Sequence, residues 1–437
     1  MRRGLRKVYI SFDASGITRF GGLFLFQQFC KFLHLRRYLQ RHVDWPDYSG
    51  RRFHPADIFL AHLFAAVAGL GRVENTKSLE LNGLFPHLLG LPDFPHRDTL
   101  RSFLWRFTVN DLRSLQAAHN HLRQELLCRM GIRWNAIVDM DATQLTVYGN
   151  QEGASAGYNK AKRGKKSYSP LLSSEGRSGL SLNLELRSGH EHSSTGALPF
   201  LKESLLRLPG TLAATRTRVR ADAGFYDKDI AQFLDENGYG YAIAARITSP
   251  VKSILSGLRF RRIREHWSCA QFGYTPMYWK KEHRFIAIRH FLGETSRPTT
   301  LFRIKDFDYR VLVTDLDIEP AAVWGFYSDR GFQELLIREL KGAYALGKIP
   351  TRSFFANAAY LEIVAWAYDL VLAFKMLCLP AAYQHWNLAT LRREFWSLPA
   401  QWVCTGHRNI LRLPPGFSHQ KAFRGAEAAL PRIKPLI

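Results

Sequence analysis

Four side chains near residue 330 have the types and spacing to bind a metal ion and a phosphate chain. They follow the pattern Tyr-x2-Arg-x3-Glu-x6-Lys and are Tyr327, Arg330, Glu334 and Lys341. If the segment is one α-helix, a turn of about 100° per residue places all four within a wedge of roughly 60°. Phe332, Leu336 and Leu340 then form an opposite, apolar face. The alternative is a salt-bridged surface helix, which charged segments usually form.

Two acids elsewhere in the chain lie where predicted strands end. Asp141 follows Ile-Val-Asp-Met and precedes Ala-Thr, and Asp222 precedes Ala-Gly-Phe. With Glu334, carboxylates in these places could converge on hard cations such as Mg²⁺, which prefers oxygen ligands. Two such ions about 3.5–4 Å apart can activate the attacking oxygen and stabilise the leaving oxygen of a phosphodiester. The three acids therefore indicate metal-dependent chemistry on a phosphodiester.

The neighbours of Asp141 leave an alternative open. Asp139 lies two residues away, so on a strand it shares a face with Asp141, and either could be the ligand. The hydroxyl of Thr143 close to Asp141 favours Asp141. Asp139 and Thr143 are then candidates for supporting the ligands through hydrogen bonds. Glu339, the other acid on the predicted helix, falls away from the charged face.

A basic loop follows the first of these predicted strands. It spans residues 149–169, and Tyr158 and Tyr168 lie among its cations. These cations are Lys160, Lys162, Arg163, Lys165 and Lys166. Basic residues mixed with aromatic ones suit a nucleic-acid backbone, although a solvated loop is the alternative. Three tryptophans could stack on an unpaired base, although core packing is their more usual role. They are Trp267, Trp279 and Trp324.

The composition narrows the class of protein. The chain has 437 residues, with 61 Lys and Arg against 37 Asp and Glu, a net charge of +24. Such an excess favours a polyanionic partner, with nucleic acid ahead of an anionic membrane. The five cysteines are scattered and form no Cys-x2-Cys pair, so neither a zinc finger nor a disulfide framework is indicated. The apolar runs Ile58–Leu70 and Val364–Tyr383 are interpreted as core helices, and we expect a cytoplasmic protein without a membrane partner.

The elements that must position the acids change in type along the chain. Residues 1–130 are predicted to be helical, including helices at His54–Leu70 and Pro95–Phe107, the latter with Asp98 or Thr99 as N-cap. The second of these helices carries three arginines and could read DNA, or could be a core helix with solvated arginines. The three are Arg97, Arg101 and Arg106.

After Trp134 the pattern becomes a mixture of strands and helices, which predicts a mixed α/β core. Strands are expected at 134–148, 179–187, 217–222 and 239–244, with a helix around 228–237. The stretch 247–320 is rich in aromatic, β-branched and basic residues and is interpreted as a β-rich insertion. From Ile318 the chain is predicted to be helical again, with a long apolar helix at Phe354–Leu379 and a basic tail.

At this point the chain resembles a known family. Asp-Ala-Thr at 141–143, Ala-Asp-Ala-Gly-Phe at 221–225 and the Tyr-Arg-Glu-Lys pattern are similar to motifs of the DDE transposases of bacterial insertion sequences. The resemblance is to the group with a β-rich insertion before the catalytic Glu. The text around Gly149–Gly153 and the closing text from Ser397 to Arg408 are similar to its IS-thirteen-eighty branch.

The resemblance implies an α/β fold with an RNase H-like core interrupted by a β-rich insertion, between an N-terminal helical domain and a helical C-terminal region. The implied parts are a DNA-binding domain at 1–130, the core at 131–246 and 321–380, the insertion at 247–320 and a basic tail at 381–437. Asp141, Asp222 and Glu334 would be the catalytic metal ligands. Tyr327, Arg330 and Lys341 would contact phosphates at the element end.

The activity implied is cut-and-paste DNA transposition with two Mg²⁺ or Mn²⁺ ions per site. The partners would be double-stranded DNA, as terminal inverted repeats and as target, and a second copy of the chain on paired ends. The setting would be the bacterial cytoplasm, with the protein on the nucleoid when bound to DNA, and the resemblance suggests a hairpin intermediate. Two alternatives stay open: another RNase H-like nuclease, and an inactive transposase-derived protein that only binds DNA.

Overall fold

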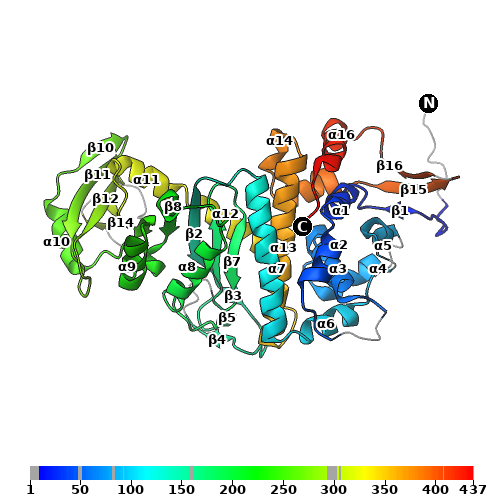
Figure 1. Ribbon diagram of the computed structural model, residues 1–437, viewed down its shortest axis with the longest axis horizontal. Helices are drawn as coiled ribbons and strands as arrows, with labels where there is room; N and C mark the ends of the chain where they lie inside the picture. The colour runs from blue at the N-terminus through cyan, green and yellow to red at the C-terminus, as the bar shows by residue number, and fades with distance from the viewer. Residues whose placement is uncertain are drawn as a thin grey trace. The chain divides into compact units, whose positions relative to one another are not determined.

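The computed structural model describes residues 9–47, 52–80, 84–91, 93–157, 162–292, 303–304, 307–406 and 408–436 (Figure 1). The chain divides into two compact units, and each is described by itself. One unit contains Met1–Arg41, Tyr48–Phe103 and Phe374–Ile437. The other contains His42–Asp47 and Leu104–Ala373. The first unit therefore combines segments from both ends of the sequence.

A large mixed sheet forms the centre of the second unit. One part has the strand order β7-β6-β2-β8-β9, in which β2, β8 and β9 run parallel and β6 and β7 are antiparallel to their neighbours. The strands are β2 Ala136–Ala142, β6 Leu171–Glu175, β7 Ser181–Glu185, β8 Thr217–Ala221 and β9 Gly240–Ala244. The structure thus confirms strands within the four segments predicted from the sequence.

The β-rich stretch after residue 247 extends the same sheet. After helix α10, Ser249–Gly257, its strands continue the order outward from β9 as β14-β12-β11-β10, with β13 beside β14. They are β10 Arg261–Arg264, β11 Trp267–Tyr274, β12 His283–Phe291, β13 Arg303–Ile304 and β14 Phe307–Thr314. Ile286 and Leu312 from these strands pack with Ala242 of β9 and Trp324, so the added strands and the first part share a core. A separate three-stranded sheet contains β3 Leu145–Thr146, β4 Ser155–Ala156 and β5 Lys166–Tyr168.

Helices of the second unit cover this sheet. They are α7 Val109–Arg129, α8 Ala197–Leu206, α9 Lys228–Asn237, α11 Pro320–Ser328, α12 Gly331–Gly342 and the first part of α13 Phe354–Cys378. Helices α7 and α13 lie side by side (Figure 1), and buried polar side chains connect them. His119 Nδ1 lies 2.6 Å from Glu362 Oε1, and Arg123 Nε donates to Asp369 Oδ2 at 3.1 Å. The long apolar helix predicted at 354–379 is confirmed.

The first unit is mainly helical. Its elements include α1 Leu23–Phe32, α2 Leu35–His42, α3 Pro55–Ala68, η1 Val73–Thr76, α4 Lys77–Glu80, α5 Leu84–Leu89, α6 Arg97–Trp105, α14 Ala381–Gln384, α15 Leu388–Leu391, η4 Arg392–Trp396, α16 Gln420–Ala429 and η5 Leu430–Arg432. Phe26 packs edge-on against Phe64 and Phe374, which joins α1 to α3 and to the end of α13.

Two expectations for this unit were wrong. The C-terminal region is not only helical, because β15 Ala400–Thr405 and β16 Arg408–Arg412 form a hairpin that pairs with β1 Ile17–Thr18. Helix α6 already begins at Arg97, so Asp98 and Thr99 lie in its first turn and neither is the N-cap. Over the residues described, no single helix has the length and apolarity to cross a membrane. Within the described part of the chain, one bent pair, Pro55–Ala68 and Val73–Leu79 at 93°, meets both criteria when taken together.

Candidate active site

Asp141 and Asp222 lie at the ends of two neighbouring parallel strands. Met140 of β2 is in register with Ala221 of β8, and Asp141 and Asp222 directly follow them in the sequence. Because parallel strands run in the same direction, both carboxylates stand at the same edge of the sheet. The sequence therefore placed these two acids correctly at strand ends, and the strand register brings them together.

Backbone amide groups orient both carboxylates. Asp141 Oδ1 accepts from its neighbour Ala142 N at 2.8 Å, and Asp222 Oδ1 accepts from Gly224 N at 2.8 Å. A Cβ atom at Gly224 would lie only 2.8 Å from the Cβ of Ser193, so this tight turn requires glycine. Burial raises the pKa of Asp141 to about 6; Arg330 opposes the rise, and the negative charge of Asp222 adds to it. The two acids therefore interact electrostatically.

The sequence predicted that the four-residue pattern lies on one helix, and this prediction was wrong. Tyr327 belongs to α11, and Arg330 is at the N-cap position of α12. Between the helices the backbone bonds tighten: Arg330 N donates to Tyr327 O at 3.0 Å and Gln333 N donates to Arg330 O at 2.9 Å. These i to i−3 bonds are the shorter turns typical of helix junctions. Tyr327 and Arg330 therefore lie on the two sides of a helix junction.

The apolar face predicted for this segment is only partly correct. Leu336 and Leu340 are buried, but Phe332 is 65% exposed. Gln333 is buried in its place, and its side-chain oxygen accepts a hydrogen bond from Ser174 of β6. The helix is thus fixed to the central sheet through a polar contact.

The guanidinium of Arg330 lies close to two acids of the predicted triad, and the charge of the third acts on it electrostatically. Nη1 donates to Asp141 Oδ2 at 3.0 Å, and Nη2 lies 3.7 Å from Glu334 Oε1. Burial opposes the charge on Arg330, but the charges of Tyr327, Asp141 and Asp222 raise its pKa. Glu334 is the exposed member, with 69% of its side chain accessible. One buried cation therefore stands among acids from a strand, a turn and a helix.

Tyr327 lies next to Arg330 of this cluster, and Lys341 lies next to the end of β2. The guanidinium carbon of Arg330 is 5.8 Å from the centre of the Tyr327 ring, and that ring packs against the core shared with the inserted strands. Lys341 Nζ donates to Thr143 Oγ1 at 3.1 Å and to the carbonyl of Gln144 at 2.9 Å, beside the end of β2. Burial lowers the pKa of Lys341. The structure thus brings Thr143 and both signature residues close to Asp141.

Asp139 has a different environment from Asp141. Its two oxygens accept from Arg220 Nε and Nη2 at 2.6 and 2.7 Å, and the acid and the guanidinium are each 1% exposed. Arg220 Nη1 also donates to the carbonyl of Phe326 at 2.7 Å, next to Tyr327. The pair therefore connects β2, β8 and α11 beneath the site. Sequence reasoning missed Arg220, although its place two residues before Asp222 on a strand was the available signal.

The donors present suit a hard divalent cation. All three predicted ligands supply carboxylate oxygens, which Mg²⁺ and Mn²⁺ prefer. Over the residues described, no three His, Cys, Asp or Glu side chains already form a group able to hold a metal ion. The guanidinium of Arg330 lies between Asp141 and Glu334 instead. The assignment of metal ligands therefore stays a prediction that the donor chemistry fits.

The other sequence candidates lie outside this cluster of contacts. Lys160 is outside the described residues; Lys162, Arg163, Lys165 and Lys166 are exposed. Lys162 donates to the Tyr148 hydroxyl, and Lys166 Nζ donates to Asn150 Oδ1 at 3.0 Å. Of the three tryptophans, Trp324 is only 8% exposed and stacks between Trp267 and Tyr327, at 5.7 and 6.1 Å, whereas Trp279 packs against Tyr226. Trp324 thus has a core position.

The fold and the site together describe an α/β protein with acids gathered at one edge of a mixed sheet. The chain belongs to the family described as transposase DDE domain group 1, whose model matches residues 2–435. The predicted transposase family is thereby confirmed, and the bacterial branch stays a prediction. No curated protein matches the chain. A solved structure of a piggyBac transposase synaptic complex with hairpin DNA is similar, with 14% identity and a TM-score of 0.47 over 87% of this chain and 81% of that chain.

Proposed function

We propose that this protein is a cut-and-paste transposase that cleaves DNA at the ends of its element and joins the freed strand to target DNA. The observation that carries the proposal is the placement of Asp141 and Asp222 at the ends of adjacent parallel strands, with Arg330 bonded to Asp141 and lying 3.7 Å from Glu334. We further infer an RNase H-like core in β7-β6-β2-β8-β9, with the strands after β9 as its insertion. Membership of a transposase family supports this inference.

Each acid would have a separate part in holding two Mg²⁺ or Mn²⁺ ions. Asp141 and Asp222 offer fixed carboxylates on adjacent strands, and Glu334 offers an exposed one on α12. When bound, such ions neutralise charge on a scissile phosphate and activate the attacking oxygen. Asp141 must lose its proton to serve as a ligand, and its pKa of about 6 means that it is mostly ionised at pH 7.

The cations of the pattern would hold the DNA strand. Arg330 is a planar donor able to contact two phosphate oxygens, and Lys341 supplies a point charge near the end of β2. Tyr327, next to Arg330, would add a phenol donor. Positioning the phosphodiester against the carboxylates by these three side chains would supply much of the catalysis.

The proposed partner is double-stranded DNA, both as terminal inverted repeats and as target. The net charge of +24 and the exposed cations Lys162, Arg163, Lys165 and Lys166, at and just before strand β5, support a polyanionic partner. Because both ends of an element must be cut and joined, a homodimer on paired ends is part of the proposal. The proposed setting is the bacterial cytoplasm.

The test is a cleavage assay on the DNA that flanks the gene, in Mg²⁺ or Mn²⁺. We expect cuts confined to inverted-repeat ends, lost in Glu334→Gln and retained in Glu339→Gln, which removes an acid from the same helix. A denaturing gel would reveal a hairpin product. Nicked product without joined product would instead support another RNase H-like nuclease. Binding without any metal-dependent cut would contradict the catalytic proposal and support an inactive DNA-binding protein.

A further inference from the structure

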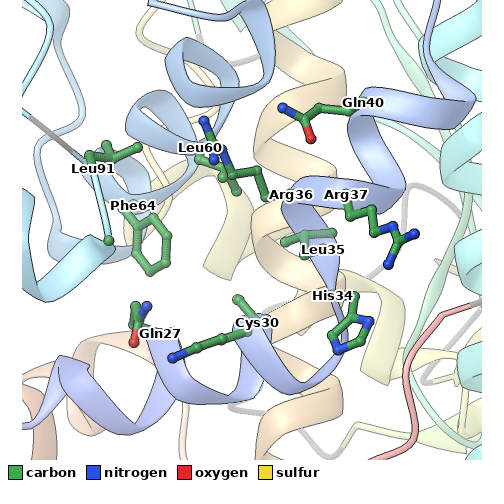
Figure 2. A pocket seen from close by; sticks show the side chains of 12 residues that line it. Gln27, Cys30, His34, Leu35, Arg36, Arg37, Gln40, Leu60, Phe64 and Leu91 are labelled. Atoms are coloured by element: carbon green, nitrogen blue, oxygen red, sulfur yellow. The ribbon is translucent and has the colours of Figure 1, made fainter.

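A groove of about 730 Å³ opens among the helices of the first unit. Its walls come from α1, the turn after it, α2, α3 and the segment after α5. Figure 2 shows Gln27 and Cys30 of α1, Arg36 of α2 and Phe64 of α3 around this space. We call it the basic groove.

The floor of the basic groove is apolar, but its side chains are buried. Leu35, Leu60 and Phe64 line it, and each is at most 6% exposed. An anionic membrane needs apolar side chains that can insert among its lipids, and this floor offers none. What a partner would meet in the groove is therefore the polar side chains of its rim.

The rim is cationic. Lys31, His34 and Arg37 are exposed there, and Arg41 follows one turn after Arg37 on the same helix. No Asp or Glu is among the described residues that line the groove. Among the described cations that line the groove, Arg36 has an acid partner: it donates to both oxygens of Asp57 at 2.6 and 2.8 Å. That ion pair attaches α2 to α3 and leaves the rest of the rim positively charged.

The turn between α1 and α2 has an unusual backbone. His34 has φ of 55°, in the left-handed region that residues other than glycine seldom adopt. Such a conformation costs on the order of 1–2 kcal/mol and is concentrated at functional sites. It is held by His34 N donating to Lys31 O and Tyr38 N donating to His34 O, each at 2.9 Å. A histidine therefore occupies a rim position whose backbone conformation glycine would adopt at lower energetic cost.

Two amide side chains complete the groove. Gln27 of α1 and Gln40 of α2 both line it (Figure 2). A glutamine amide both donates and accepts, which suits the edge of a base, whereas lysine and arginine suit phosphates. A rim of cations around amides therefore combines groups for backbone contact with groups for base contact.

Helix α6, whose arginines the sequence suggested could read DNA, has fewer cations available for a phosphate than the basic groove. Arg101 of α6 donates to Glu74 Oε1 at 2.7 Å and to Asp98 Oδ1 at 3.2 Å. Arg106, just beyond its end, donates to the carbonyl of Asp47 at 2.8 Å. These two arginines already have acceptors within the protein, so binding a phosphate would require breaking existing contacts.

We propose that the basic groove and the exposed face of α2 bind duplex DNA and hold an end of the element. The phosphate backbone would lie along Lys31, Arg37 and Arg41, with His34, Gln27 and Gln40 facing the bases. This inference rests on the proposed function, because it names the surface through which a transposase would select its DNA. Charge complementarity between a rim lined by cations and a polyanion supports it.

The experiment measures the affinity of the full chain for a fluorescent duplex of the flanking DNA by anisotropy. A chelator is present so that cleavage cannot interfere, and salt is varied from about 50 to 200 mM. Arg37→Gln with Arg41→Gln is compared with Arg97→Gln with Arg101→Gln, which removes the same charge from α6. We expect the α2 variant to bind at least about tenfold more weakly at low salt. Its salt slope should be smaller by about two, one for each lost phosphate contact.

The control pair should change affinity by less than about threefold. Thermal unfolding of both variants shows whether each folds, and Lys31→Gln provides a milder change if the α2 pair does not. Equal weakening by both pairs, or an unchanged α2 variant, would overturn the inference. So would binding to anionic vesicles in place of the duplex, or α2-dependent binding to duplex RNA alone.

Failure of this inference and failure of the proposed function give different results. If the wild-type protein cuts the flanking DNA while the α2 variant binds it normally, the groove is not the DNA surface but the transposase proposal stands. If binding depends on α2 while no metal-dependent cut occurs, the groove inference stands and the catalytic proposal fails.

Discussion

The carboxylate cluster of the second unit and the basic groove of the first unit have opposite arrangements of charge. In the cluster, acids surround a guanidinium, and Arg330 Nη1 contacts Asp141 at 3.0 Å. In the groove, cations line a rim that has no acid among its described lining residues. On the functions proposed above, the cluster would receive cations yet carries a cation of its own, whereas the groove would receive a polyanion and leaves its charges exposed. The difference suggests that the cluster must rearrange for its ligands and the groove need not.

The largest effect is expected beneath the cluster, at Asp139. Asp139→Ala would leave the buried Arg220 guanidinium without its acid, which costs about 3–5 kcal/mol of unfolding free energy. Replacing both partners, with Asp139→Leu and Arg220→Met, should recover most of that loss because no buried charge remains. Chemical denaturation measures both. Arg37→Gln in the basic groove, where the side chain is exposed, should change stability by less than about 0.5 kcal/mol.

Equal losses of unfolding free energy in Asp139→Ala and Arg37→Gln would contradict the expected difference between the buried cluster and the exposed groove. A double variant less stable than Asp139→Ala would show instead that the hydrogen bond from Arg220 to Phe326 contributes more than the ion pair.

The next effect concerns pH. Burial raises the pKa of Asp141 from its usual 3.8 to about 6 in the folded state, so that state holds the proton more tightly than the unfolded chain does. The contribution of Asp141 to stability is therefore most favourable below about pH 4 and declines as the pH rises to about 6. A shift of about two units corresponds to roughly 3 kcal/mol.

Asp141→Asn removes this titration. With a chelator present, the variant should be more stable than wild type at pH 7, by up to about 3 kcal/mol, and nearly equal to it below pH 4. Chemical denaturation across this range is the measurement, and Glu334→Gln, at an exposed acid, is the control. An Asp141→Asn variant less stable than wild type at pH 7 would show instead that the ion pair with Arg330 outweighs burial.

A smaller effect tests whether Arg330 opposes a metal ion. Arg330→Gln removes a positive charge beside the carboxylates, so Mn²⁺ should bind about tenfold more tightly without DNA, even though DNA cleavage should fall. Calorimetric titration at pH 8, where Asp141 is ionised, measures the affinity. Arg338→Gln removes an exposed cation from the same helix and should leave it unchanged. Weaker Mn²⁺ binding in Arg330→Gln would mean that Arg330 orients the acids for the ion.

The sequence predicted what local pattern and spacing determine. Alternating or β-branched runs gave the central strands, and Asp141 and Asp222 stood at their ends as expected. It could not show the break between α11 and α12, because residues on both sides have helical propensity and only tertiary contacts decide. Nor could it show that Arg330 meets Asp141, since those residues are 189 positions apart. The prediction that Phe332 belongs to the apolar face was wrong for the same reason. The polar contact of Gln333 with Ser174 determines which side of α12 is buried.

The smallest effect is expected at His34, where the groove rim has its unusual backbone. His34→Gly would relieve the left-handed conformation but would add freedom to the unfolded chain, so stability should change by less than about 1 kcal/mol. Duplex affinity should fall by about threefold or less, because one rim contact is lost while Lys31, Arg37 and Arg41 remain. His34→Asn, which tolerates the same conformation and keeps a polar group, should bind between the two. If His34→Gly gained stability and bound DNA as tightly as wild type, the conformation would serve the turn alone. The basic groove would then owe its affinity to the exposed cations, which is the feature that separates it from the carboxylate cluster.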